Sequence, residues 1–145
     1  MVKVQIKRCL DVELPKYHTV DSAGFDISAG EDKVIGPNQV QNIRTGLIIQ
    51  APHGHFLLIS ARSSLAAKKG LKLANGVGIV DRDYAGPNDE IFLALHNFTD
   101  KDVEIKKGER LAQGIFIASE QIEWSEVSQL TATDRGGHGS TGGYL

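Results

Sequence analysis

The sequence predicts an all-β domain, because short apolar stretches with strand periodicity alternate with turn residues along most of its 145 residues. One stretch favours a helix, and the C-terminal residues are too rich in glycine to pack into a core. The apolar fraction of 41% and the charged fraction of 23% are typical of one globular domain. Many short strands separated by turns favour a sandwich, a jelly roll or a barrel.

The first predicted strand lies at the N-terminus, where Val2, Val4 and Ile6 alternate with polar residues. Other stretches rich in β-branched and apolar residues are predicted strands: 39–50, 56–60, 91–95, 103–105 and 111–117. Turn residues separate them, as at 52–54, where proline and glycine flank a histidine.

The predicted helix spans residues 65–69, which are good helix formers. Ser63 or Ser64 can cap its start, and Gly70 stands where a helix ends. This helix would place Arg62, Ser63 and Ser64 at its N-terminus, where unpaired N–H groups favour an anion. The alternative is a helix cap beside a surface arginine with no ligand.

The predicted domain covers residues 1–130, and a flexible C-terminal arm covers residues 131–145. Val127 and Leu130 predict one last packed turn at this boundary. Glycine supplies five of the nine residues 135–143, so this segment offers a guanidinium, hydroxyls and open N–H groups to an anion. The alternative is a disordered tail without a ligand.

Composition limits the classes of partner. The formal net charge of −2 gives no overall field to attract nucleic acid or a membrane, so neither partner is expected. Cys9 is the single cysteine, which excludes an intrachain disulfide. We find no signal peptide or membrane-spanning run and expect an intracellular, cytoplasmic protein.

The densest polar cluster lies in the loop at residues 75–87. Val77, Ile79 and Val80 suggest burial, and Asp81 follows them. A carboxylate in a partly desolvated cleft can act as a general base on water, and Tyr84 follows three residues later. The alternative is that Asp81 or Asp83 only caps a turn before residues 86–87.

Gln113 interrupts the apolar run at 111–117, so its amide needs a partner, which is either a backbone group or a ligand. Asp26 follows Gly24 closely and suggests a turn. Two anion-binding clusters and one aspartate-bearing loop in so small a domain favour a shared polyphosphate site over chance.

Five stretches resemble, in order, the five motifs of the trimeric dUTPases: 23–27, 61–66, 78–86, 108–113 and 135–142. The resemblance covers nearly the whole chain. It implies a jelly-roll or β-clip subunit in a homotrimer, with active sites between subunits and hydrolysis of dUTP to dUMP and pyrophosphate. It also implies a Mg²⁺ cofactor held by the substrate phosphates and water, with no direct protein ligand. Asp26 would touch that ion only through water.

The resemblance also implies roles for single residues. Asp81 matches the base that activates the water attacking the α-phosphorus, and Tyr84 matches the residue beneath the deoxyribose. The uracil-reading hairpin is matched by Asn75, Gly78, Ile79, Val80 and Asp89. Phosphate contacts are matched by Arg62, Ser63, Ser64 and Gln113. The arm residues that close the site are matched by Arg135, His138, Gly139, Ser140 and Thr141.

Some positions depart from the family pattern. Ala61 and Ser64 replace a proline and a glycine, and the arm is two residues shorter between Arg135 and His138. His138 replaces a stacking phenylalanine, so we expect weaker or more pH-dependent closure. The second motif also resembles the dCTP deaminases, including bifunctional members, but Ala94 stands where they carry a glutamate. A nucleotide-binding regulatory protein on the same scaffold is a further alternative.

Overall fold

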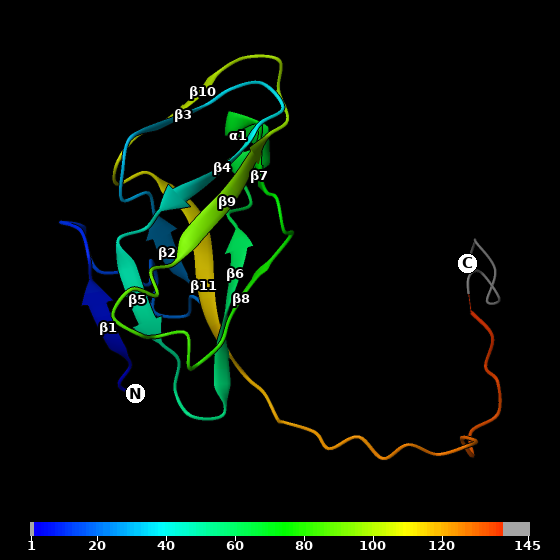
Figure 1. Ribbon diagram of the computed structural model, residues 1–145. Helices are drawn as coiled ribbons and strands as arrows, with labels where there is room; N and C mark the ends of the chain where they lie inside the picture. Colours follow the sequence, from blue (N-terminus) through cyan, green and yellow to red (C-terminus); the bar gives the residue numbers. More distant parts are fainter. Residues whose placement is uncertain (1, 138–145) are drawn as a thin grey trace.

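The computed structural model describes residues 2–137, and within this range the chain folds as short strands with one helix (Figure 1). The predicted all-β class with a single short helix is confirmed. The strands are β1 (Gln5–Arg8), β2 (Phe25–Ser28), β3 (Lys33–Ile35), β4 (Val40–Arg44), β5 (Leu47–Gln50), β6 (His55–Ala61), β7 (Leu71–Leu73), β8 (Gly78–Val80), β9 (Phe92–Asn97), β10 (Val103–Ile105) and β11 (Arg110–Ala118). The helix α1 spans Leu65–Lys69.

The strands pair antiparallel in two larger and two small sheets. The larger sheets have the orders β2-β11-β6-β8 and β4-β9-β7, and the small sheets are β1-β5 and β3-β10. Figure 1 shows the three-stranded sheet in front of the four-stranded one, and buried side chains from both contribute to one core. The four-stranded sheet therefore has one face on this core and one outer face.

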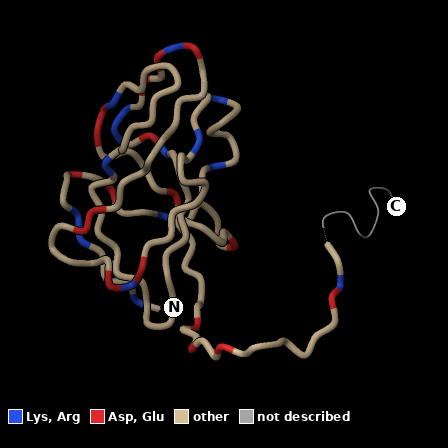
Figure 2. Tube along the Cα trace, turned by 45° about the vertical axis from the view of Figure 1, so that its right-hand side comes forward, with Lys and Arg blue, Asp and Glu red and all other residues tan. Residues whose placement is uncertain are grey.

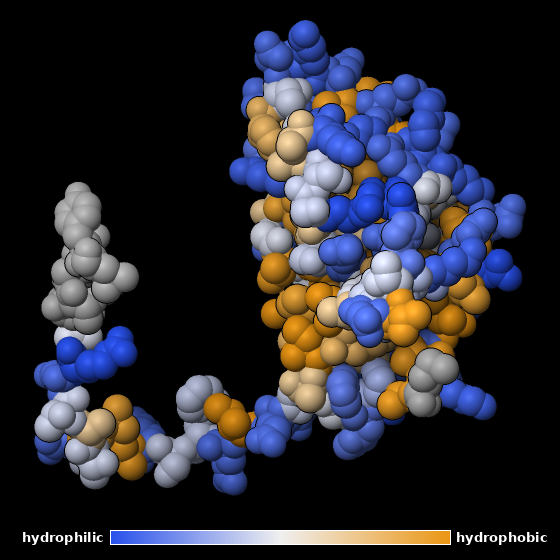
Figure 3. All heavy atoms as spheres, turned by 180° about the vertical axis from the view of Figure 1, so that it is seen from behind, coloured by the Kyte–Doolittle hydropathy of each residue, from blue (hydrophilic) through white to orange (hydrophobic). Residues whose placement is uncertain are grey.

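Strand periodicity explains which side chains the four-stranded sheet buries. Leu57 and Ile59 of β6 point into the core, whereas Leu58 points to the outer face beside Ile79 and Ile115, its partners on β8 and β11. Seen from behind, apolar residues gather over the lower half of the body (Figure 3). The burial predicted for Val77 and Ile79 is wrong for the single chain, because the two side chains are 46% and 64% exposed and β8 is an edge strand.

The predicted strand at 39–50 is interrupted at Gly46, which separates β4 from β5. Gly46 has φ +72°, and a Cβ there would lie 2.8 Å from the Cβ of Leu10, so the chain turns where only glycine fits. The turn expected around Asp26 is wrong. Asp26 lies inside β2, where the neighbouring Phe25 and Ile27 fill the core.

The predicted helix is confirmed from Leu65 to Lys69, and Gly70 ends it in the left-handed conformation at φ 64°. Ser64 occupies the N-cap position, but its side chain forms no capping hydrogen bond. The last residue of the helix is anchored instead, because the Lys69 ammonium donates to the Glu109 carboxylate at 2.6 and 2.8 Å.

The chain after β11 leaves the body as an extended segment, and residues 119–137 are exposed (Figure 1). Val127 and Leu130 are 55% and 78% exposed, so the packed turn predicted there is wrong. The division into a domain at 1–130 and an arm at 131–145 stays a prediction.

Charge is spread over the surface. Figure 2 shows acidic and basic residues intermixed over the body, in keeping with the small net charge of −2. No helix in the described range combines the length and the apolarity needed to cross a bilayer.

Asn97 is a buried polar residue, and it predicts a stability effect. Its amide donates to the carbonyls of Ile35 and Lys101 at 2.8 and 2.7 Å, and its oxygen accepts from the Thr99 amide at 2.9 Å. Asn97→Ala leaves these groups without partners and should lower the free energy of unfolding by roughly 2–3 kcal/mol in urea denaturation. The exposed Asn42→Ala is the matched control, expected within about 0.5 kcal/mol of the parent. Equal effects of the two substitutions would contradict this role.

Candidate active site

A cavity of about 300 Å³ lies between β8, the turn that follows it, and β9. We call it the hairpin pocket. Its lining is Ile59, Leu73, Asn75, Gly78, Ile79, Val80, Asp81, Tyr84, Glu90, Ile91, Phe92, Leu93 and Ala94. Six residues predicted to bind or process a ligand are therefore together in one cavity: Asn75, Gly78, Ile79, Val80, Asp81 and Tyr84.

Asp81 lines this pocket, and its carboxylate has no hydrogen-bond partner among the described residues. Its backbone carbonyl accepts a hydrogen bond from the Tyr84 amide at 3.2 Å, which shapes the turn. Its side chain is exposed and forms no hydrogen bond or ion pair with another described residue. The cap of the following turn is Asp89, whose Oδ2 accepts from the Gly86 amide at 2.7 Å. Asp81 is thus free to accept a proton from a bound molecule.

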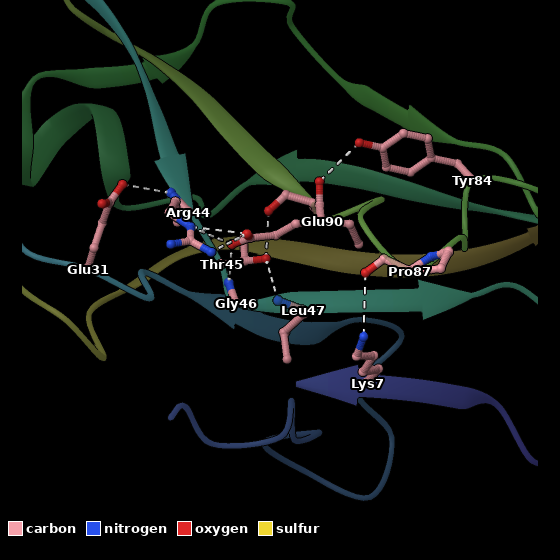
Figure 4. Close-up of polar contacts among 10 residues, drawn as sticks. Lys7, Glu31, Arg44, Thr45, Gly46, Leu47, Tyr84, Pro87 and Glu90 are labelled. Atoms are coloured by element: carbon pink, nitrogen blue, oxygen red, sulfur yellow. Dashed lines mark hydrogen bonds and ion pairs between the residues drawn. The ribbon is translucent and has the colours of Figure 1, made fainter. Parts of the chain in front are cut away.

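The ring of Tyr84 is held from behind (Figure 4). Its hydroxyl donates to the backbone carbonyl of Glu90 at 3.1 Å. The Glu90 carboxylate is buried and accepts from Arg44 Nη2 at 2.7 Å, from Arg44 Nε at 3.0 Å and from the Gly46 amide at 2.8 Å. The hydrogen bonds to Glu90 raise the pKa of Arg44 above its usual value.

A second polar group, the Asp26 cluster, consists of Asp26, Arg62 and Arg110. Asp26 Oδ1 forms an ion pair with Arg62 Nε at 3.2 Å, and Asp26 Oδ2 accepts a hydrogen bond from Arg110 Nη1 at 3.1 Å. His18 lies near the same Arg110 nitrogen, at 3.4 Å. Two cations around one carboxylate leave a net positive charge, so the cluster suits an anionic ligand better than a bare metal ion.

Gln113 adds an uncharged amide to this cluster. It pairs with Asp26 on one side and Ser60 on the other, and cross-strand partners share a face of the sheet. Its half-buried side chain forms no hydrogen bond with another residue of the described range, and the same holds for the hydroxyls of Ser63 and Ser64. These groups are available to a ligand.

The hairpin pocket and the Asp26 cluster lie far apart in one chain. Gly78 pairs with Ile59 and Val80 with Leu57, so continuation of the register places Asp81 beside Phe56. Arg62 follows the other end of β6, six residues further along. At about 3.3 Å per residue, Asp81 and Arg62 are separated by about 20 Å.

A family model described as dUTPase matches residues 11–142. The chain belongs to the dUTPase family. It is 40% identical to the deoxyuridine 5'-triphosphate nucleotidohydrolase of Anaplasma marginale, over 98% of this chain and 99% of that protein. A crystal structure of the dUTPase from Streptococcus mutans aligns at a TM-score of 0.77 with 34% identity, covering 82% of this chain and 98% of that one. A dUTPase of Staphylococcus bacteriophage 80alpha shares the fold at a TM-score of 0.87 and 21% identity, over 98% of this chain and 99% of that one.

Most of the predicted ligand-binding residues of this dUTPase chain lie in the hairpin pocket or at the Asp26 cluster and its neighbours. The others lie elsewhere. Asp89 lies outside the pocket lining, because its side chain caps the turn at Gly86. Arg135 lies on the exposed segment after β11. Four predicted residues lie outside the described range: His138, Gly139, Ser140 and Thr141. The functional roles of all these residues stay predictions.

Sequence reasoning missed Arg110 as a member of the Asp26 cluster. Arg110 and Gln113 are three residues apart, which in a regular strand would place them on opposite faces. A register shift between Arg110 and Ala112 lets two residues of β11 face one on β2, so Arg110 joins the face of Asp26. No composition signal marks this bulge.

The hairpin pocket offers no free acid or base in the place where the deaminase alternative requires a glutamate. Ala94 lines the hairpin pocket and contributes only a methyl group. Glu90 also lines it, but its carboxylate is taken by Arg44 and Gly46. Among the described residues, no group of three or more His, Cys, Asp or Glu could hold a metal ion.

Proposed function

We propose that this chain hydrolyses dUTP to dUMP and pyrophosphate. The observation that carries the proposal is the free carboxylate of Asp81 in the hairpin pocket, beside Tyr84. Membership of the dUTPase family supports it, and so does the 40% identity to the Anaplasma marginale relative, a deoxyuridine 5'-triphosphate nucleotidohydrolase.

Asp81 acts as the general base. Its ionised carboxylate accepts a proton from a water molecule while the water oxygen forms a bond to the α-phosphorus. The bond from that phosphorus to the bridging oxygen of the β-phosphate breaks, and its electron pair leaves with pyrophosphate. Because the side chain has no competing partner among the described residues, its lone pairs remain available to the water.

The rest of the hairpin pocket selects base and sugar. Backbone groups from Gly78 to Val80, with Asn75, present fixed donors and acceptors that distinguish uracil from cytosine. Tyr84 lies beneath the deoxyribose, where its ring leaves no space for a 2'-hydroxyl.

The Asp26 cluster and its neighbours bind the phosphates. Arg62 donates to phosphate oxygens, and Asp26 holds its guanidinium in place through the 3.2 Å ion pair. Ser63, Ser64 and Gln113 add uncharged donors. Arg135 and the motif at 138–141 close over the distal phosphates.

Mg²⁺ fits this site as an ion bound to the substrate. Asp26 is already paired with two arginines, so it suits contact through water and not direct ligation. When bound, the ion neutralises charge on the phosphate oxygens. The residues of this chain orient the triphosphate and remove the proton.

We propose further that complete sites form only between subunits of a homotrimer. The α-phosphorus must lie near Asp81 while the phosphates lie near Arg62, yet about 20 Å separates these residues in one chain. A second copy supplies the missing half. The apolar outer face at Leu58, Ile79 and Ile115 fits an interface between copies.

Asp81→Asn tests the general base. The amide keeps the shape of the side chain but cannot accept the proton, so kcat should fall by about 10²–10⁴-fold in a pyrophosphate-release assay. Binding of a non-hydrolysable dUTP analogue should remain close to that of the parent. Near-normal turnover would remove the assignment, and a nucleotide-binding regulatory protein would show no turnover even in the parent.

Mixing two inactive variants tests the shared site. Asp81→Asn chains carry an intact Arg62, and Arg62→Ala chains carry an intact Asp81. Co-refolding equal amounts should rebuild up to about a quarter of the sites and restore activity in proportion. Each variant refolded alone is the control. Activity equal to the average of the two controls would place the whole site within one chain.

A substrate panel separates hydrolysis from deamination. With dUTP, dCTP, UTP and dTTP, we expect pyrophosphate release mainly from dUTP and no ammonia from dCTP, because Ala94 provides no acid or base. Ammonia release from dCTP would support the bifunctional deaminase instead.

A further inference from the structure

The ion pair behind Tyr84 has no part in the proposed chemistry, although it is among the most strongly bonded groups of the fold. Arg44 ends β4, and Glu90 precedes β9, its partner strand. Their side chains meet in a two-pronged contact, with Nη2 and Nε of Arg44 at 2.7 and 3.0 Å from the same Glu90 oxygen and Nε at 3.2 Å from the other. Glu90 is only 6% exposed, so this charge is expensive to bury without its partners.

Backbone bonds fix the residues on either side of the pair. The Gly46 amide donates to Glu90 Oε1 at 2.8 Å, and the Ile91 amide donates to the Leu47 carbonyl at 2.9 Å. The buried Thr45 hydroxyl donates to the Ile91 carbonyl at 2.7 Å. These contacts hold residues 90–91 against 44–47, and we call this set of contacts the Glu90 clamp (Figure 4).

The Glu90 clamp is connected to the Tyr84 hydroxyl by the only hydrogen bond that this hydroxyl forms with residues 2–137. Tyr84 is 42% exposed, and its hydroxyl donates to the Glu90 carbonyl at 3.1 Å. A ring with so much open surface can rotate or shift unless its far end is tied. The clamp fixes the carbonyl that receives this bond, and so fixes how far the ring projects into the hairpin pocket.

We propose that Glu90 and Arg44 are positioning residues that set sugar selection by holding Tyr84 against the position of the 2'-carbon. The inference rests on the proposed function, which places Tyr84 beneath the deoxyribose. Exclusion of a hydroxyl by contact requires the ring to resist displacement, because a shift of about 1 Å creates room for the extra oxygen. Arg44 lies outside the lining of the hairpin pocket, and the Glu90 carboxylate, although part of that lining, is engaged by Arg44 and Gly46.

Three substitutions interrupt the chain of contacts at different points. Arg44→Met removes the cation, Glu90→Gln removes the charge with little change of shape, and Tyr84→Phe removes only the hydroxyl. Each should raise kcat/KM for UTP relative to dUTP by roughly three- to tenfold, the value of one hydrogen bond. Thermal melting accompanies each assay, since loss of a buried partner also lowers stability.

Lys69→Met is the matched control. It breaks a half-buried ion pair of similar length, Lys69 to Glu109 at 2.6 Å, which joins α1 to the loop before β11 and does not border the hairpin pocket. It should lower the melting temperature but leave the UTP to dUTP ratio at the parental value. A purely structural role for the Glu90 clamp would make Arg44→Met behave in the same way, and the proposal would be wrong.

A double substitution tests the route. If Glu90 acts through the Tyr84 hydroxyl, Glu90→Gln with Tyr84→Phe should raise the ratio no further than the larger single effect. If the effects of the two single substitutions on this ratio multiply in the double variant, Glu90 does not act through the Tyr84 hydroxyl and the proposal is overturned. If Glu90→Gln does not fold, Tyr84→Phe alone still tests the proposal. An unchanged ratio of kcat/KM for UTP to that for dUTP in Tyr84→Phe would contradict a role for the hydrogen bond between Tyr84 and Glu90. Failure of the parent to prefer dUTP over UTP would refute the proposed function instead.

Discussion

The register of β6 between β11 and β8 is the constraint on which the site depends. Antiparallel pairing fixes Gly78 opposite Ile59 and Gln113 opposite Ser60, so the hairpin pocket and the Asp26 cluster lie toward opposite ends of one strand. A slip of one residue would turn Leu57 and Ile59 out of the core, which makes this register costly to change. The separation of Asp81 from Arg62 therefore follows from the pairing of β6 with β8, and it is the basis for proposing that two subunits share one site.

Much of the fold could be predicted, because apolar periodicity reports burial directly. The helix at 65–69 was correct because good helix formers lead into Gly70, whose φ of 64° ends it. The strand at 39–50 was only partly correct, since the close approach of Leu10 to Gly46 is a tertiary contact. The packed turn predicted at Val127 and Leu130 was wrong, because an apolar side chain favours burial but does not specify which surface it packs against.

The candidate site was less accessible to sequence reasoning. The hairpin residues could be found because Asn75, Asp81 and Tyr84 are close in sequence and end in one pocket. Arg110 depends on a bulge, and Glu90 depends on a partner 46 residues away, so neither has a local signal. The resemblance to five family motifs supplied what periodicity could not, namely which of the polar residues are expected to act on a common ligand.

The two carboxylates nearest the pocket show how burial divides their tasks. Asp81 is exposed and unpaired among the described residues, which leaves it free for proton transfer. Glu90 is buried, and its carboxylate accepts hydrogen bonds from Arg44 Nε, Arg44 Nη2 and the Gly46 amide, which fix its orientation. An apolar contact behind Tyr84 would cost less desolvation, but it would have no preferred direction. Directional hydrogen bonds specify one geometry, and the proposed exclusion of a single hydroxyl needs one geometry more than it needs additional stability.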